Sequence, residues 1–290
     1  MQNAIGPALV MLAAFLWGIS GGLAGLLMDH DWSPAVVTFY RGAVGLVCLL
    51  LGWLPHTVRH VRHINRRLLA WAVLAGLGVA GNLTFYAIAI DRTSVAIAAT
   101  LMYTAPVHVF AVACLTGNER PTLGKGLAIA LVMIGIVLLT DVLGGGGQAV
   151  TLVGVAAGLA SALSYALFIF AFQRSAAHGA MTSTLIIAFA VFSIVLGLIM
   201  NRGEAVQALY SSDLQLFLLL GLLGAGLSFA VYLPGLRRTP ATIASIVAMI
   251  EPVTAALFGL LVLGESLDLG QAAGLALIVI TVTVLSARRP

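Results

Sequence analysis

The sequence predicts an all-α integral membrane protein whose ten transmembrane helices form two inverted five-helix repeats around a central cavity. The composition, the number of apolar segments and an internal repeat carry this prediction. Of the 290 residues, 61% are hydrophobic and only 8% are charged, whereas about 25% of the residues of a soluble domain are charged. This composition excludes an ordinary cytosolic enzyme and a disordered chain. A net charge of only +4 also argues against a nucleic-acid partner.

Polar breaks divide the chain into ten apolar segments, each close to the roughly 20 residues that a helix needs to cross a bilayer. The segments lie at residues 5–28, 34–54, 68–90, 94–117, 123–143, 151–173, 181–200, 213–235, 240–263 and 270–287. The longest break covers residues 55–67, and the glycines at 144–147 suit a flexible linker. No break is long enough for a soluble domain.

The distribution of Lys and Arg predicts that both termini are cytoplasmic. With the N-terminus inside, eleven of the 14 basic residues fall on the cytoplasmic side and only Arg92 and Arg202 on the other, while Arg41 lies within a span. The eleven are Arg59, Arg62, Arg66, Arg67, Arg120, Lys125, Arg174, Arg237, Arg238, Arg288 and Arg289. Such a bias follows the positive-inside rule. The basic stretch 59–67 is expected to contact anionic lipid headgroups.

The chain matches itself without gaps when it is shifted by 146 residues. Tyr86 then falls on Tyr232, Arg92-Thr93 on Arg238-Thr239, Pro106 on Pro252, and Glu119 on Glu265. We expect one structural domain made of two repeats, at 1–146 and 147–290. Because each repeat has five spans, an odd number, the second repeat enters the membrane from the opposite side. Inverted repeats suit alternating access to a central site, although a duplication that only builds a stable bundle gives the same pattern.

Three ionisable residues fall inside predicted spans, where a charge is costly and is a functional candidate. Glu251 is a candidate for proton coupling or for binding a substrate ammonium group; alternatively, a protonated Glu251 locks the bundle by an interhelical hydrogen bond. His108 could couple protons near neutral pH or be a neutral packing residue. Arg41 could attract a substrate carboxylate, extend to the headgroups or pair with a backbone carbonyl.

A cavity for a small zwitterion needs a few polar groups to orient the ligand and apolar walls to shape it. The candidates for substrate binding lie near the middle of spans or share a helical face there: Trp17, Asn82, Tyr86, Tyr103, Tyr165, Ser228 and Tyr232. The alternative for this group is interhelical hydrogen bonding and aromatic packing. Pro106 and Pro252, at counterpart positions, are hinge candidates or static kinks.

Several chemistries lack a sequence signature. There is no phosphate-binding loop and no metal-ligand spacing of Cys and His, so we expect no metal and no cofactor. Cys48 and Cys114 lie in apolar runs and are expected to pack as small hydrophobes. An intramembrane enzyme would need a nucleophile with a base, and neither Ser161 nor Ser164 has an obvious partner.

Together, Arg41, Asn82 and Tyr86, the Glu251-Pro252-Val253 run and the repeated Glu119 and Glu265 resemble the EamA-domain transporters of the drug/metabolite transporter superfamily. The resemblance covers the whole chain as two EamA units. The first repeat departs from it, with Ala105-Pro106 where the second has Glu251-Pro252.

The resemblance implies export or exchange of small polar metabolites, including amino acids. We expect an exporter of amino acids or similar small metabolites in the bacterial inner membrane that functions as a monomer. Within the family, the chain is most similar to exporters of aromatic amino acids and viologens. The resemblance leaves proton antiport and facilitated efflux open. The alternatives are a multidrug or viologen carrier, a nucleotide-sugar carrier, for which Arg41 is the only intramembrane cation, and, from another class, an intramembrane enzyme or sensor.

Overall fold

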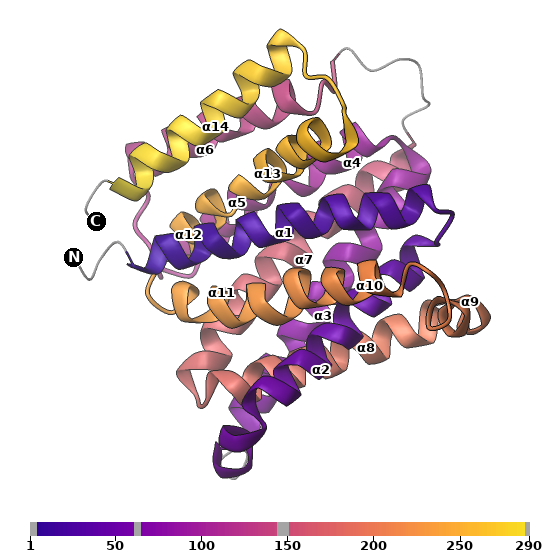
Figure 1. Cartoon of the computed structure of the whole chain (residues 1–290). Helices are drawn as coiled ribbons and strands as arrows, with labels where there is room; N and C mark the ends of the chain where they lie inside the picture. The colour runs from indigo at the N-terminus through magenta and orange to yellow at the C-terminus, as the bar shows by residue number, and fades with distance from the viewer. Residues whose placement is uncertain (1–4, 61–64, 144–150, 288–290) are drawn as a thin grey trace.

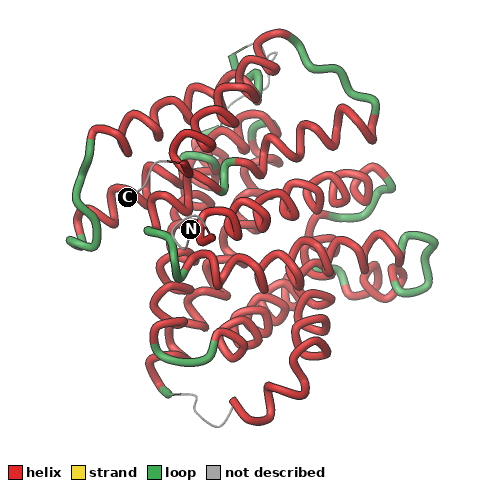
Figure 2. Tube along the Cα trace, turned by 60° about the vertical axis from the view of Figure 1, so that its left-hand side comes forward, coloured by secondary structure: helices red, strands yellow, loops and turns green. Residues whose placement is uncertain are grey.

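The computed structural model describes residues 5–60, 65–143 and 151–287, and throughout these ranges the chain is helical without a strand. Within these ranges, ten helices or helix series cross the body of the protein, and the loops gather towards its two opposite ends (Figure 2). They are α1 (Ile5–Asp29), α2 (Pro34–His60), α3 (Arg66–Arg92), α4 and α5 (Val95–Met102, Ala105–Leu115), α6 (Leu123–Leu139), α7 (Leu152–Ala177), α8 (Met181–Ile199), α10, η3 and α11 (Leu214–Gly221, Leu222–Leu227, Ser228–Leu236), α12, α13 and η4 (Ala241–Val247, Ile250–Phe258, Gly259–Leu263), and α14 (Leu269–Ala287).

Within the described ranges, nine of these ten are long and apolar enough to span a membrane, and the tenth, α6, is an apolar helix of 17 residues. Seventeen residues correspond to about 25 Å of helical rise, at the short end of what a bilayer requires. The start of α1 and the end of α14 lie at the same edge of the protein (Figure 1). The predicted ten-helix membrane fold is therefore confirmed.

Two predicted breaks contain helix. The stretch predicted as a connection from residue 55 starts as helix, because α2 continues to His60 and a proline is tolerated in a membrane helix. The break after α8 contains the short α9 (Arg202–Ala208), whose first amides, those of Gly203 and Glu204, donate to the side chain of Asn201. Arg62, the predicted linker 144–147 with the repeat boundary at 146/147, and the terminal Arg288 and Arg289 lie outside the described residues.

The fourth and ninth spans are interrupted at counterpart places. A proline ring clashes with the carbonyl four residues earlier and offers no amide proton. Met102, four residues before Pro106, is the last residue of α4, and Ala248, four residues before Pro252, is the C-cap of α12. The Ala248 carbonyl instead accepts a hydrogen bond from the Glu251 amide at 2.9 Å. Each interruption therefore has its cause in the sequence.

The packing of the helices repeats with the two halves exchanged. Helix α1 runs along α11, and α7 runs along α3; α2 packs on α8, and α6 packs on α14. Gly6 near the start of α1 lies against Arg238 and Thr239, while Gly154 near the start of α7 lies against Arg92 and Thr93. These reciprocal contacts are those of two five-helix repeats in inverted orientation.

Candidate functional site

A cavity of about 540 Å³ lies between the two repeats. It opens at the end of the protein where α1 and α3 end and α2 and α4 begin. The residues around this opening, called the mouth below, are Met28, Pro34, Ile90, Val95, Leu263 and Glu265. Among the described residues, α4 makes no extensive contact with α13 across the mouth, whereas their counterparts α12 and α5 pack together at the other end. Within the part of the chain that the structure describes, the cavity is thus closed at the inner end and open at the mouth.

An aromatic floor closes the inner end of the cavity. Its lining residues are Trp17, Tyr165, Phe168 and Phe229. The rings of Trp17 and Phe229 are 5.0 Å apart between centroids, and those of Tyr165 and Phe168 are 4.5 Å apart, as in favourable aromatic pairs. The Nε1 of Trp17 and the hydroxyl of Tyr165 are buried without a protein partner. The floor is therefore largely apolar, and two polar atoms buried within it lack a protein hydrogen-bond partner.

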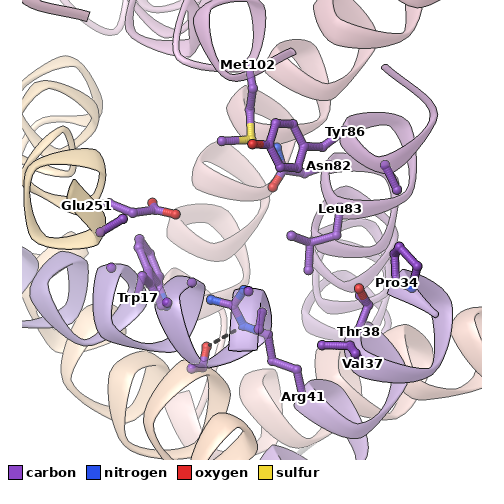
Figure 3. A pocket seen from close by; sticks show the side chains of 18 of the residues that line it. Trp17, Pro34, Val37, Thr38, Arg41, Asn82, Leu83, Tyr86, Met102 and Glu251 are labelled. Atoms are coloured by element: carbon purple, nitrogen blue, oxygen red, sulfur yellow. Dashed lines mark hydrogen bonds between the residues drawn. The ribbon is translucent and has the colours of Figure 1, made fainter. Parts of the chain in front are cut away.

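Two opposite charges face the cavity from different repeats. Glu251 lies in the first turn of α13, directly after the interruption of the ninth span, and Arg41 lies on α2. Figure 3 shows the Glu251 carboxylate and the Arg41 guanidinium pointing into the same space, with Trp17 beside them. The salt bridges found among the described residues do not include a pair between these two groups. Each charge is thus available to a ligand.

The position of Arg41 depends on a short π-helical segment, η3. The Nε of Arg41 donates a hydrogen bond to the backbone carbonyl of Gly224 at 3.4 Å, and Gly224 lies in η3. A Cβ at Gly224 would collide with Arg41 and with Ser20, so only glycine allows this approach. π-Helical segments occur frequently at functional sites, and here the segment supports the cation that faces the cavity.

The wall opposite Glu251 comes from α3 and α4. Asn82, Tyr86 and Met102 lie close together on this wall (Figure 3). The Asn82 amide nitrogen donates to the carbonyl and the hydroxyl of Ser161 on α7, at 3.1 and 3.0 Å. Asn82 therefore lines the cavity and also joins two helices.

The structure brings seven of the predicted binding and coupling candidates to this cavity: Trp17, Arg41, Asn82, Tyr86, Tyr103, Tyr165 and Glu251. It places Ser228, Tyr232 and His108 elsewhere. Tyr232 is fully buried behind the floor, with its ring centroid 4.8 Å from that of Trp17, and His108 Nδ1 lies 3.1 Å from the Thr104 carbonyl of its own helix segment. Pro106 and Pro252 also lie outside the lining, in the first turns of α5 and α13.

Two further parts of the lining, a glycine face on α1 and a phenylalanine wall, were not among the predicted site residues. Gly18, Gly21, Gly22 and Gly25 line the cavity, as do Phe168, Phe189, Phe192 and Phe229. The glycine spacing of three and four residues marks one side of a helix and could have been found in the sequence. The phenylalanines carry no comparable signal, because apolar side chains also fill the core and face the lipid.

One solved crystal structure superimposes on the chain with a TM-score of 0.76, covers 96% of this chain and 95% of that chain, and is 19% identical. At this identity the likeness shows a shared fold. A transporter of Archaeoglobus fulgidus, described as uncharacterized, is 30% identical over 280 residues, which cover 96% of this chain and 95% of the relative.

The threonine/homoserine exporter RhtA of Salmonella typhimurium LT2 is 30% identical over 268 residues, which cover 90% of this chain and 84% of the relative. The same exporter of Escherichia coli K12 is 29% identical over 270 residues. The profile of the EamA-like transporter family matches twice, at residues 4–141 and 152–287. The chain is therefore a multi-pass membrane protein that belongs to the EamA-like transporter family.

Proposed function

We propose that this protein exports neutral amino acids, or similar small zwitterionic metabolites, by alternating access across the bacterial inner membrane. The observation that carries the proposal is the pair of opposite charges, Arg41 and Glu251, facing one cavity without a mutual ion pair. A charge at membrane depth is costly and calls for a compensating partner. A bound amino acid compensates both, with its carboxylate on Arg41 and its ammonium group on Glu251.

The apolar surroundings suit the rest of such a ligand. Met102, Leu83 and the aromatic floor provide walls for a side chain, and one cation with one carboxylate fixes the orientation of the backbone groups. The relatives named as threonine/homoserine exporters support an amino-acid substrate. The cavity lies within one chain, which supports function as a monomer.

The distribution of basic residues supports the direction. If both termini are cytoplasmic, as the positive-inside rule predicts, the mouth faces the outside of the cell. The structure then corresponds to the outward-open state of an exporter, from which the substrate leaves.

Glu251 suits an exchange of substrate for protons. A carboxylate binds either a proton or an ammonium group, so a proton taken up from outside displaces the substrate at the open mouth. Loss of that proton to the cytoplasm after the cavity reopens there restores the site for the next substrate. The net result is antiport of one proton against one zwitterion.

The test is counterflow and pH-driven flux of labelled L-threonine, L-leucine and L-phenylalanine in proteoliposomes. We expect saturable flux in the wild type, loss of at least about tenfold in transport efficiency for Arg41→Gln, and loss of pH-gradient-driven flux for Glu251→Gln. Asp91→Asn and Arg92→Gln, which remove an exposed ion pair, are matched controls and are expected to transport normally. Absence of flux from folded, inserted protein, or equal behaviour of the variants and controls, would overturn the proposal.

A carrier of cationic drugs is the second candidate, because the aromatic floor and Glu251 also suit an organic cation. Arg41 at the same cavity opposes a permanent dication. Methyl viologen in the same vesicles separates the two: transport of viologen without any amino acid favours the drug carrier.

A further inference from the structure

Glu119 and Glu265 occupy counterpart positions in the two repeats and have the same backbone setting. The amide of Glu119 donates to the carbonyl of Ala113 at 3.1 Å, and that of Glu265 donates to the carbonyl of Gly259, also at 3.1 Å. Each glutamate thus follows the end of an interrupted span, α5 in one repeat and η4 in the other. Their side chains nevertheless make different contacts.

Glu119 joins the two repeats at the sealed end of the cavity, where α5 and α12 pack together. Its Oε1 accepts a hydrogen bond from the backbone amide of Thr242 at 3.1 Å, and its Oε2 lies 2.6 Å from Lys125 Nζ. The side chain of Glu119 is only 9% exposed and that of Lys125 is 19% exposed, so water screens this pair little. Thr242 lies at the start of α12, for which the N-cap residue Pro240 supplies no side-chain hydrogen bond. One carboxylate therefore ties the first repeat to α12 of the second.

Glu265 makes no such contact with any residue that the structure describes. It is exposed and lines the mouth, and its carboxylate lies over Gly259 of its own span. The counterpart of Thr242 is Ala96, near the start of α4 and next to the mouth residue Val95. Among the described residues, no hydrogen bond joins Glu265 to α4. Within the described ranges, the hydrogen bond that joins Glu119 to α12 at the sealed end therefore has no counterpart between Glu265 and α4 at the mouth.

We propose that Glu119 and Glu265 are alternating latches, each closing one end of the cavity in turn. In the state seen here, Glu119 holds α12 and the inner end is shut. When the mouth closes, α4 moves against α13 and the Glu265 carboxylate accepts a hydrogen bond from the backbone amide of Ala96. At the same time, the hydrogen bond from the Thr242 amide to Glu119 breaks. This assignment rests on the alternating access of the proposed function.

The two latches are unequal in a way that favours the observed state. Lys125, the ion-pair partner of Glu119, has Gln271 as its counterpart, and Gln271 instead exchanges hydrogen bonds with Asp268, at 3.0 and 2.8 Å. The latch at the inner end is thus assisted by a cation, while the latch at the mouth is not. The mouth is accordingly open at rest.

The test measures how readily the cavity is reached through the mouth. A cysteine at Gly25, where an added Cβ meets nothing within 4 Å, is introduced after Cys48 and Cys114 are replaced by alanine, and its alkylation by a polar maleimide is timed. We expect Glu119→Ala to slow alkylation about tenfold, with a smaller effect in the same direction for Lys125→Gln. Gln271→Lys adds a cation to the mouth latch and is also expected to slow alkylation. Glu265→Ala should leave alkylation as fast as in the parent while slowing substrate exchange.

Glu204→Ala is the matched control, because Glu204 also accepts hydrogen bonds from a backbone amide and a hydroxyl, both of Ser33, but ties the start of α2 to α9, on the side of the mouth that carries no latch. It is expected to leave the alkylation rate unchanged even if it lowers the melting temperature. Unchanged alkylation in folded Glu119→Ala and Lys125→Gln, or equal slowing by Glu119→Ala and Glu265→Ala, overturns the latch proposal. If the alkylation changes appear but the parent moves no amino acid, the latches stand and the proposed substrate fails.

Discussion

Asn82 on α3 and Ser161 on α7 are joined by three hydrogen bonds: two donated by the side-chain amide nitrogen of Asn82, and one donated by the Ser161 hydroxyl to the backbone carbonyl of Asn82 at 2.8 Å. Both residues are buried, and the bonds join the two repeats beside the cavity. We expect Ser161→Ala to lower the free energy of unfolding by about 1 kcal/mol, the usual scale for a hydrogen bond between membrane helices.

A double-mutant cycle with Asn82→Ala measures the coupling of this pair, which is expected to be about 0.6–1.7 kcal/mol. Ser193→Ala is the control, since the Ser193 hydroxyl is buried without a protein partner and its removal should cost little. Additive effects of the two substitutions would show that the pair is not coupled.

Gly224→Ala is expected to impair substrate binding while the charge of Arg41 is kept. The added methyl group collides with Arg41 and Ser20, so the guanidinium must leave the position from which it faces the cavity. We expect KM for amino acids to rise about tenfold, measured by flux in proteoliposomes. Gly25→Ala, which adds a methyl group to open space, is the control; an equal rise in both variants would mean that crowding of the cavity, rather than Arg41, is responsible.

Gly18→Ala and Gly21→Ala, three residues apart on α1, should affect stability differently. A Cβ at Gly18 meets the carbonyl of Glu251 and the side chain of Thr254, whereas one at Gly21 meets nothing within 4 Å. We expect Gly18→Ala to destabilise the protein by about 1–3 kcal/mol through overpacking. Gly21→Ala should be neutral or stabilising, because alanine favours a helix by about 1 kcal/mol over glycine. Melting temperatures in detergent check this, and equal losses would contradict the placement of the α1 face.

Asp213, in the connection before α10, is expected to make stability depend on acid pH. The Trp32 indole N–H, donating at 2.8 Å, and His30 lower the pKa of Asp213 below its usual value of 3.8. Because the folded-state pKa is depressed, this carboxylate stabilises the fold fully above the unfolded-state pKa, and the contribution is lost as the pH falls through the folded-state value. The melting temperature of Asp213→Asn should therefore be lower than that of the wild type from pH 5 to 8, with the gap narrowing below about pH 4.

Asp91→Asn controls for the loss of a surface carboxylate near the same end of the protein. A gap for Asp213→Asn that stays constant down to pH 2.5, or that equals the gap for Asp91→Asn, would show that the bond from Trp32 does not favour the charged form.

Hydropathy was sufficient to predict the ten spans, because the cost of exposing polar backbone or charge to lipid dominates the choice of sequence. It could not predict the π-helical segments η3 and η4, which arise where tertiary packing shifts the helical hydrogen bonds. Nor could it predict that α2 continues to His60, since a proline ends a helix in water more reliably than in a membrane.

The charged residues of the cavity could be predicted from the sequence, whereas residues chosen because they are counterparts in the two repeats could not be predicted reliably. Arg41 and Glu251 stood out because ions within spans are few. Tyr86 and Tyr232 are counterparts in sequence, yet Tyr86 faces the cavity and Tyr232 is fully buried behind the floor. A repeat in sequence is nearly symmetric, but a cavity open at one end is not, so counterpart residues meet different surroundings.

The ties around Ser33 and Asp213 have a consequence for how the mouth narrows. Glu204 accepts a hydrogen bond from the hydroxyl of Ser33, just before α2, and Asp213 accepts one from the indole N–H of Trp32. The segment between α8 and α10 is therefore joined to the start of α2 on one side of the mouth. Across the opening, no hydrogen bond joins α4 to η4 among the residues described. We therefore expect the start of α2 and the connection between α8 and α10 to move together when the mouth narrows, so a binder that contacts only these two segments would not detect the motion.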